Sequence, residues 1–176
     1  GIADLSPAKA RENLERIGHV TPQSVLPPLK GDSWGYRRKG RFSVRHVNKK
    51  GRTLVGFRET DPRFVADLKV CHTVIPHIGD RVEALASLVE SLDARNDIPQ
   101  IEFIAGDDTV ALVFRHLAPL NEGDLAKLVA FAQLHVFAIF LQSGGIDTVA
   151  PLWPDVAPLA FALPQWNIEL AFRPLD

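Results

Sequence analysis

The residues of this chain that could do chemistry gather first around its single cysteine. The stretch FVADLKVCHTVIP, residues 64–76, contains Cys71 and His72, and His77 follows directly. A thiolate nucleophile needs a base or a positive charge beside it, but neighbouring side chains on a strand point to opposite faces, which places His72 poorly for Cys71. A zinc site would need paired ligands at a recognisable spacing, which these residues lack. A core cysteine, a nucleophile and one ligand of a larger site all stay open.

Basic residues are concentrated between positions 30 and 58. Ten of the 20 Lys and Arg residues fall in this stretch, where Asp32 is the only acid, although the whole chain has a formal net charge of −1. From Phe131 to the end the sequence has one basic residue, Arg173. Local charge of this kind can attract a polyanion even when the molecule is almost neutral. Because a charge run is often only a solvated face, both interpretations stay open here.

One strand in the basic stretch separates its charges from its aromatic residues. In WGYRRKGRFSV, Tyr36 and Phe42 share one parity, and Arg37, Lys39 and Arg41 share the other. Alternate residues of a strand lie on opposite faces, so we expect the three cations together on one face and both aromatic rings buried on the other. Arginine offers phosphate oxygens a planar fork of donors. The pattern predicts contact with RNA or DNA through Arg37, Lys39 and Arg41.

The order of the predicted elements indicates an α+β fold, with a largely antiparallel sheet and about three flanking helices. Apolar periodicity and end signals predict helices at residues 7–17, 77–95 and 121–135. Strand pairs are predicted at 34–47 with 53–59, and within 98–117 around a Gly-Asp-Asp turn; further strands are predicted at 136–142 and in the segment WNIELAF.

Composition limits the class of protein. Hydrophobic residues make up 46% of the chain and charged residues 23%, as in a globular domain with a real core. No apolar run approaches the roughly 18 residues needed to span a bilayer, so we expect no membrane segment, and the first residues lack the parts of a secretory signal. One cysteine is typical of a reducing compartment such as the cytoplasm. The absence of methionine, even at position 1, predicts a segment of a longer protein.

Five segments in this order resemble the RlmD/RumA group of 23S rRNA (uracil-5-)-methyltransferases, within the TrmA-like superfamily of RNA 5-methyluridine methyltransferases. They are WGYRRKGRFSV, LVGFRE, VADLKVCHTVIP, IEFIAGDDTVALVFRHLAPL and IELAFRPLD. The resemblance extends over nearly the whole chain and is weakest in SGGIDTVAPLWPDVAPLAFALP. Related transfer-RNA methyltransferases share the Gly-Tyr-Arg element but lack the cluster cysteines, so Cys71 favours the ribosomal group.

The resemblance implies a role for Cys71. Members of the group hold a [4Fe-4S] cluster with three closely spaced cysteines and a fourth in a segment that resembles DLKVC. Cys71 matches the fourth ligand. Because the cluster needs four ligands, this chain alone is expected to hold none.

The resemblance also implies the domain organisation. Residues 1–30 would form an N-terminal helix and a proline-rich linker, and residues 31–176 a central domain that contacts large-subunit ribosomal RNA. The catalytic domain, which binds S-adenosylmethionine, and an N-terminal barrel would lie outside this chain and be its partners, so no catalytic residue and no bound cofactor are expected here. The implied location is cytoplasmic. The alternative is a stand-alone RNA-binding or adaptor module without methyltransferase activity.

Overall fold

The computed structural model of the chain describes residues 7–27, 30–61 and 63–175. Its internal contacts divide the chain into two units, Gly1–Asp32 and Ser33–Asp176. The first unit contains helix α1 (Pro7–Arg16), which has no buried residue. Glu12 of this helix forms exposed ion pairs one turn away, with Lys9 at 2.9 Å and Arg16 at 2.8 Å. Pairs of this kind support a helix that has little packing of its own.

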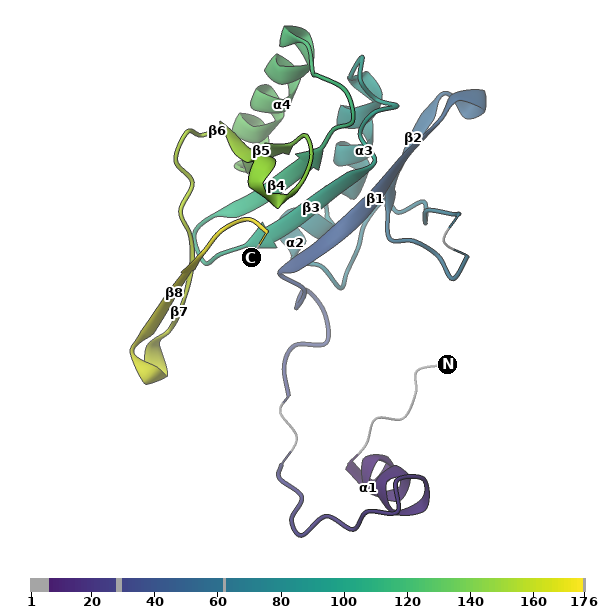
Figure 1. The fold of residues 1–176 in the computed structure, drawn as a ribbon, viewed down its shortest axis with the longest axis vertical. Helices are drawn as coiled ribbons and strands as arrows, with labels where there is room; N and C mark the ends of the chain where they lie inside the picture. Colours follow the sequence, from purple (N-terminus) through teal and green to yellow (C-terminus); the bar gives the residue numbers. More distant parts are fainter. Residues whose placement is uncertain (1–6, 28–29, 62, 176) are drawn as a thin grey trace. The chain divides into compact units, whose positions relative to one another are not determined.

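The second unit is built on a six-stranded sheet with the order β2-β1-β3-β4-β5-β6 (Figure 1). Neighbouring strands are antiparallel except β4 and β5, which are parallel because a helix crosses between them. A separate hairpin joins β7 to β8. The strands are β1 (Lys39–Val47), β2 (Arg52–Gly56), β3 (Gln100–Ala105), β4 (Val110–Arg115), β5 (Ala138–Gln142), β6 (Val149–Trp153), β7 (Leu159–Leu163) and β8 (Ile168–Phe172).

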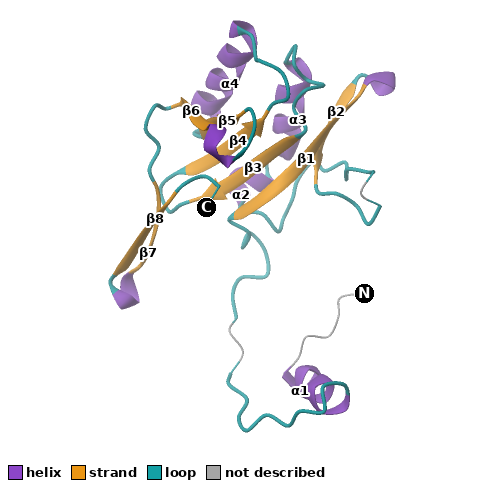
Figure 2. Ribbon diagram, viewed as in Figure 1, coloured by secondary structure: helices purple, strands orange, loops and turns teal. Residues whose placement is uncertain are grey.

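Helices α2 (Pro76–Gly79), α3 (Val82–Ser91) and α4 (Glu122–His135) cover one face of this sheet (Figure 2). The strands turn alternate apolar side chains toward them, as the period of two requires. The resulting core takes Phe42 and Val44 from β1 and joins them to Leu85 and Val89 of α3. A smaller cluster on the opposite face packs Leu159 of β7 against the sheet. The helices thus cover one face of the sheet and the β7–β8 hairpin covers part of the other, and β1 is one of the inner strands.

Helix α4 is fixed at its start by two side chains. Asn121 caps the helix, since its side-chain oxygen accepts a hydrogen bond from the N–H of Asp124 at 2.8 Å. The buried carboxylate of Asp124 accepts in turn from the N–H groups of Asp93, at 2.8 Å, and Ala94, at 3.1 Å. These bonds tie the beginning of α4 to the loop that follows α3.

The predicted α+β class is confirmed, with a largely antiparallel sheet. The helix predicted over residues 77–95 is wrong in its continuity, because the structure divides it into α2 and α3 and ends α3 at Ser91. The break has a backbone cause. The carbonyl of Gly79 accepts from the N–H of Cys71, and the N–H of Glu83 donates to the carbonyl of Lys69, so the bond that would continue the helix is not made. None of the described helices is long and apolar enough to cross a membrane.

Replacement of Phe42 tests the placement of β1. Phe42 is fully buried and its ring contacts those of Phe57 and Phe103, so Phe42→Ala should lower the free energy of unfolding by about 3–5 kcal/mol. Tyr36→Ala is the control, because Tyr36 is 53% exposed and lies before the strand; we expect a loss of less than about 0.5 kcal/mol. Urea denaturation measures both. Similar losses in the two variants would contradict the structure.

Candidate RNA interface and cysteine site

The basic strand and the cysteine segment are joined by backbone hydrogen bonds. The N–H of Gly35 donates to the carbonyl of His72 at 2.7 Å, and the N–H of Arg37 donates to the carbonyl of Thr73 at 2.9 Å. Arg37 and Val74 form a short parallel bridge at the same place. Two segments that lie far apart in the sequence therefore form one local structure, just before β1 begins.

Cys71 lies at the start of a turn, not on a strand as the sequence suggested. Its N–H donates to the carbonyl of Gly79 at 2.9 Å, and its carbonyl accepts from the N–H of Val74 at 3.3 Å. The thiol is half-buried and its sulfur lies 3.3 Å from Oγ1 of Thr73. A Cβ at position 79 would collide with the carbonyl oxygen of Cys71, so only glycine allows the turn to approach α2 this closely.

The two nearby histidines have partners of their own. The ring of His72 meets the ring of Trp34 edge-on, with centroids 6.2 Å apart. Nε2 of His77 donates to the carbonyl of His135 at 2.8 Å. Within the described parts of the chain, no group of three or more His, Cys, Asp and Glu side chains could hold a metal ion. The residues present offer one thiol, which does not by itself fit a cluster that needs four ligands.

A cluster of basic side chains joins α2 to the end of α4. Nε of Arg81 donates to Nδ1 of His135 at 3.3 Å, and its terminal nitrogen donates to the carbonyl of His77 at 2.9 Å. Burial lowers the pKa of His135 below its ordinary value, and electrostatic interaction with Arg81 and with the neighbouring His77 lowers it further. A neutral His135 is the form that can accept from Arg81. These contacts are structural, and they brace the helix against which the Cys71 turn rests.

Acids from distant parts of the chain reach the basic stretch. Glu102 and Asp107 come from β3 and from the turn that follows it, and Asp67 follows β2. The backbone N–H of Ala162 and the charge of Arg38 hold the pKa of Asp107 below its usual value. The surface is therefore less positive than the sequence implies. The ion pairs are Arg38–Asp107 at 2.9 Å, Arg41–Glu102 at 2.9 Å and Arg52–Asp67 at 2.7 Å.

The three cations predicted to contact RNA do not all share one face. Lys39 and Arg41 alternate with Phe42 on β1 and lie on the face away from the helices, as expected. Arg37 precedes the strand, and its guanidinium lies 5.2 Å from the ring centroid of Phe57, a ring that packs against Phe42. The expectation of a common face is thus met by two of the cations and is wrong for Arg37.

Tyr36 also differs from its expected place. The prediction that it is buried with Phe42 is wrong, because its side chain is exposed. The strand begins only at Lys39, and Gly35 adopts a positive φ of 62°, so the alternation of β1 does not extend back to Tyr36. Trp34, on the other side of that glycine, is exposed as well. In the sequence, the glycine at position 35 is the feature that indicates such a turn, because glycine adopts a positive φ readily.

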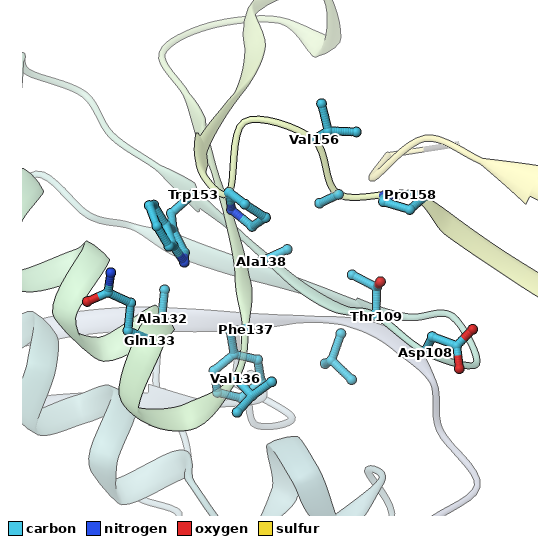
Figure 3. Close-up of a pocket in the computed structure, with 13 residues that line it drawn as sticks. Asp108, Thr109, Ala132, Gln133, Val136, Phe137, Ala138, Trp153, Val156 and Pro158 are labelled. Atoms are coloured by element: carbon cyan, nitrogen blue, oxygen red, sulfur yellow. The ribbon is translucent and has the colours of Figure 1, made fainter.

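Two hollows of the second unit lie away from the cysteine. One, with a volume of about 410 Å³, opens between the beginnings of β4 and β5, the end of α4 and the segment 153–158 (Figure 3). Its walls are apolar, including Phe137 and Trp153, and Asp108 is the only ionisable residue among the described residues that line it. A second cleft of about 440 Å³ lies beside Arg38 and Lys39. Neither brings together the groups of a catalytic centre.

Comparison with known proteins shows which class of protein this chain resembles. No protein-family model matches the chain. It is 69% identical over 165 residues to a 23S rRNA (uracil(1939)-C(5))-methyltransferase, RlmD, of Xanthomonas axonopodis pv. citri, 66% identical to that of Stenotrophomonas maltophilia and 64% identical to that of Xylella fastidiosa. Each match covers 94% of this chain and 37% of the relative, so the chain spans little more than a third of these proteins' length.

A solved structure agrees with the sequence matches. The tRNA (uracil-54, C5)-methyltransferase of Pyrococcus abyssi, in complex with S-adenosyl-L-homocysteine, superposes with a TM-score of 0.61 over 93% of this chain and 40% of that one. The two sequences are 14% identical, so this likeness concerns the fold alone. The class to which the chain is similar is the RNA (uracil-5-)-methyltransferases. Within that class its similarity is to RlmD, and the resemblance to the RlmD/RumA group is confirmed for a segment of these proteins.

The contact between Cys71 and Gly79 gives a direct test of the site. Gly79→Ala should lower the unfolding free energy by about 1–3 kcal/mol, because the new methyl group meets backbone that cannot easily move. It should also speed the reaction of the Cys71 thiol with a disulfide reagent. Gly31→Ala is the matched control, since no atom lies within 4 Å of a Cβ there. Unchanged stability and unchanged thiol reactivity in Gly79→Ala would show that the turn does not rest on this glycine.

Proposed function

We propose that this chain is the central part of an S-adenosylmethionine-dependent 23S rRNA (uracil-5-)-methyltransferase, where it contacts RNA and supplies one ligand of a [4Fe-4S] cluster. The observation that carries the proposal is its 64–70% identity over 165 residues to proteins named as such enzymes. Methyl transfer is assigned to the polypeptide outside the matched segment, since the chain corresponds to 37% of each relative. A ribosomal RNA substrate in turn implies a cytoplasmic location.

The RNA contact is assigned to the beginning of the basic strand. Lys39 and Arg41 are two residues apart on one face of β1, so their Cα atoms are separated by about 6.6 Å along the strand. Glu102 holds the guanidinium of Arg41 at 2.9 Å but leaves 62% of that side chain exposed. Such a guanidinium is oriented in advance and still has donors for a phosphate oxygen. Arg37 precedes the strand and does not share this face, and it is included because its side chain is exposed.

The cluster contact is assigned to Cys71. The turn holds the sulfur half-buried at a fixed place, and the Thr73 hydroxyl lies within hydrogen-bond distance of it. Three further thiolates would have to come from outside this chain, which has one cysteine. What supports the assignment is the match of the DLKVC segment to the fourth cluster ligand of the RlmD/RumA group.

The iron content of the purified chain tests the role of Cys71. The 176-residue protein should be colourless and contain no stoichiometric iron, because one thiolate cannot hold a cubane cluster. Iron analysis and the visible spectrum measure this. A brown protein with about four irons per chain would contradict the account. In a full-length relative, replacement by serine of the cysteine that aligns with Cys71 should lower the iron content, and an unchanged content would also contradict it.

The salt dependence of RNA binding tests the cations. Each phosphate neutralised on a single strand adds about 0.7 to the slope of log affinity against log salt, so contacts by Arg37, Lys39 and Arg41 give a slope of about 2. Replacement of all three by alanine should lower both the slope and the affinity for an unpaired RNA oligonucleotide. An unchanged affinity and slope in the triple variant would show that this strand is only a solvated face.

Two double variants remove the same amount of positive charge from different places in the basic stretch. Lys39→Ala/Arg41→Ala and Lys49→Ala/Lys50→Ala each remove two cations, but the second pair lies in the turn between β1 and β2. The first should reduce the slope by about 1.4 and the second should change it little. In the first variant Glu102 loses its ion pair with Arg41, and its free carboxylate would repel RNA phosphates. Adding Glu102→Gln removes this carboxylate, so any remaining loss of affinity comes from the lost cation contacts. Equal effects of both double variants would indicate general charge attraction.

A further inference from the structure

Two exposed aromatic rings stand immediately before the basic strand. Trp34 is 67% exposed and Tyr36 is 53% exposed. Single exposed aromatic residues are common on proteins and need no explanation by themselves. Here two of them flank one glycine, and Arg37, Arg38 and Lys39 follow without interruption. The chain thus places exposed ring surface and positive charge next to each other in the sequence.

The backbone that carries the two rings is held in place. Gly35, between them, donates to the carbonyl of His72, and Arg37, just after them, donates to the carbonyl of Thr73. A Cβ at position 35 would lie 3.3 Å from Cδ of Pro76, which shows how closely the segment approaches α2. Because this backbone is already held, binding of a ligand does not have to order it, and this favours binding.

A third exposed ring, that of Trp166, serves as a comparison because no Lys or Arg lies near it in the sequence. Trp166 lies in the turn between β7 and β8 and is 64% exposed, almost as much as Trp34. The only charged residue in positions 159–172 is Glu169, which would repel a phosphate. Exposure is nearly the same at the two tryptophans, but the charge around them differs. Trp34 is the one suited to a nucleic acid.

We propose that Trp34 and Tyr36 form a stacking platform for unpaired bases of RNA, beside the phosphate contacts of the basic strand. The inference rests on the proposed RNA-contacting function and adds to it the kind of RNA: single-stranded, with bases turned outward. Every base has a flat π-face, so stacking on aromatic rings tolerates any sequence. Bases within a duplex already stack on one another and offer these rings no face. The platform therefore favours a loop or an opened strand over a helix.

Fluorescence of Trp34 provides the first test. Trp153→Phe/Trp166→Phe leaves Trp34 as the only tryptophan of the 176-residue chain. An unpaired RNA octamer should quench its emission in a saturable way. Inorganic polyphosphate and a short RNA duplex, at concentrations that give equal occupancy, should quench it much less, because they bring charge without free bases. Equal quenching by polyphosphate would overturn the proposal.

Affinity measurements provide the second test. Trp34→Ala and Tyr36→Ala should each weaken binding of the octamer by about 5- to 100-fold, the effect of one lost stack, with the salt slope unchanged. Trp34→Phe and Tyr36→Phe keep a ring and should retain most of the affinity. Trp166→Ala, matched in residue type and exposure, should leave it unchanged. Because all three side chains are exposed, melting temperatures should stay close to that of the wild type, and they are measured as a check.

The outcomes separate this inference from the function on which it rests. If the octamer binds, and the cation variants weaken it while the aromatic variants do not, the platform is wrong and the RNA contact stands. If the wild-type chain binds neither octamer nor duplex, the proposed RNA contact itself fails. If Trp34 emission shifts with protein concentration in the absence of RNA, together with dimer formation in sedimentation, the rings serve a protein contact and the proposal is overturned.

Discussion

Backbone hydrogen bonds between residues 35–37 and the turn at residues 71–75 are the constraint on which the candidate site depends. They fix where β1 begins and which way the residues before it face. The same turn rests on Gly79, whose carbonyl accepts from Cys71. Because these contacts join backbone atoms, they fix the backbone that carries the exposed rings and the thiol. The aromatic pair, the cations and the cysteine therefore belong to one structural unit.

Several cations of the basic stretch are paired with acids, so their positive charge is partly neutralised and their side chains are oriented. The sequence concentrates cations in one stretch, and the fold brings Asp67, Glu102 and Asp107 to it from elsewhere. Exposed ion pairs add little to stability. Their consequence here is orientation, since a guanidinium held by a carboxylate keeps a defined direction and retains donors for another anion. A surface of this kind suits the weak, salt-dependent contact with RNA that is proposed for it.

The sequence predicted the elements whose signals are local. Periodicity and end residues located α1, α4 and the strand pairs, because a capping Asn121 or a Gly-Asp-Asp turn acts within a few residues. Predictions failed where a distant segment intervened. The helix over 77–95 is broken by a bond from Cys71, and Tyr36 is exposed because pairing with residues 72–75 replaces the strand before Lys39. The role of Cys71 could be suggested only by resemblance, since one thiol carries no spacing signal.

Amide hydrogen exchange of the 176-residue chain tests the central claim most directly. The N–H groups of Gly35, Arg37 and Cys71 donate to backbone carbonyls outside any long strand or helix. If they hold the site together, they should exchange almost as slowly as the amides of β1 and β3, which open only with the core. Exchange at the rate of exposed loop amides, with β1 and β3 still protected, would show that the turn and the aromatic segment move independently and would contradict the account.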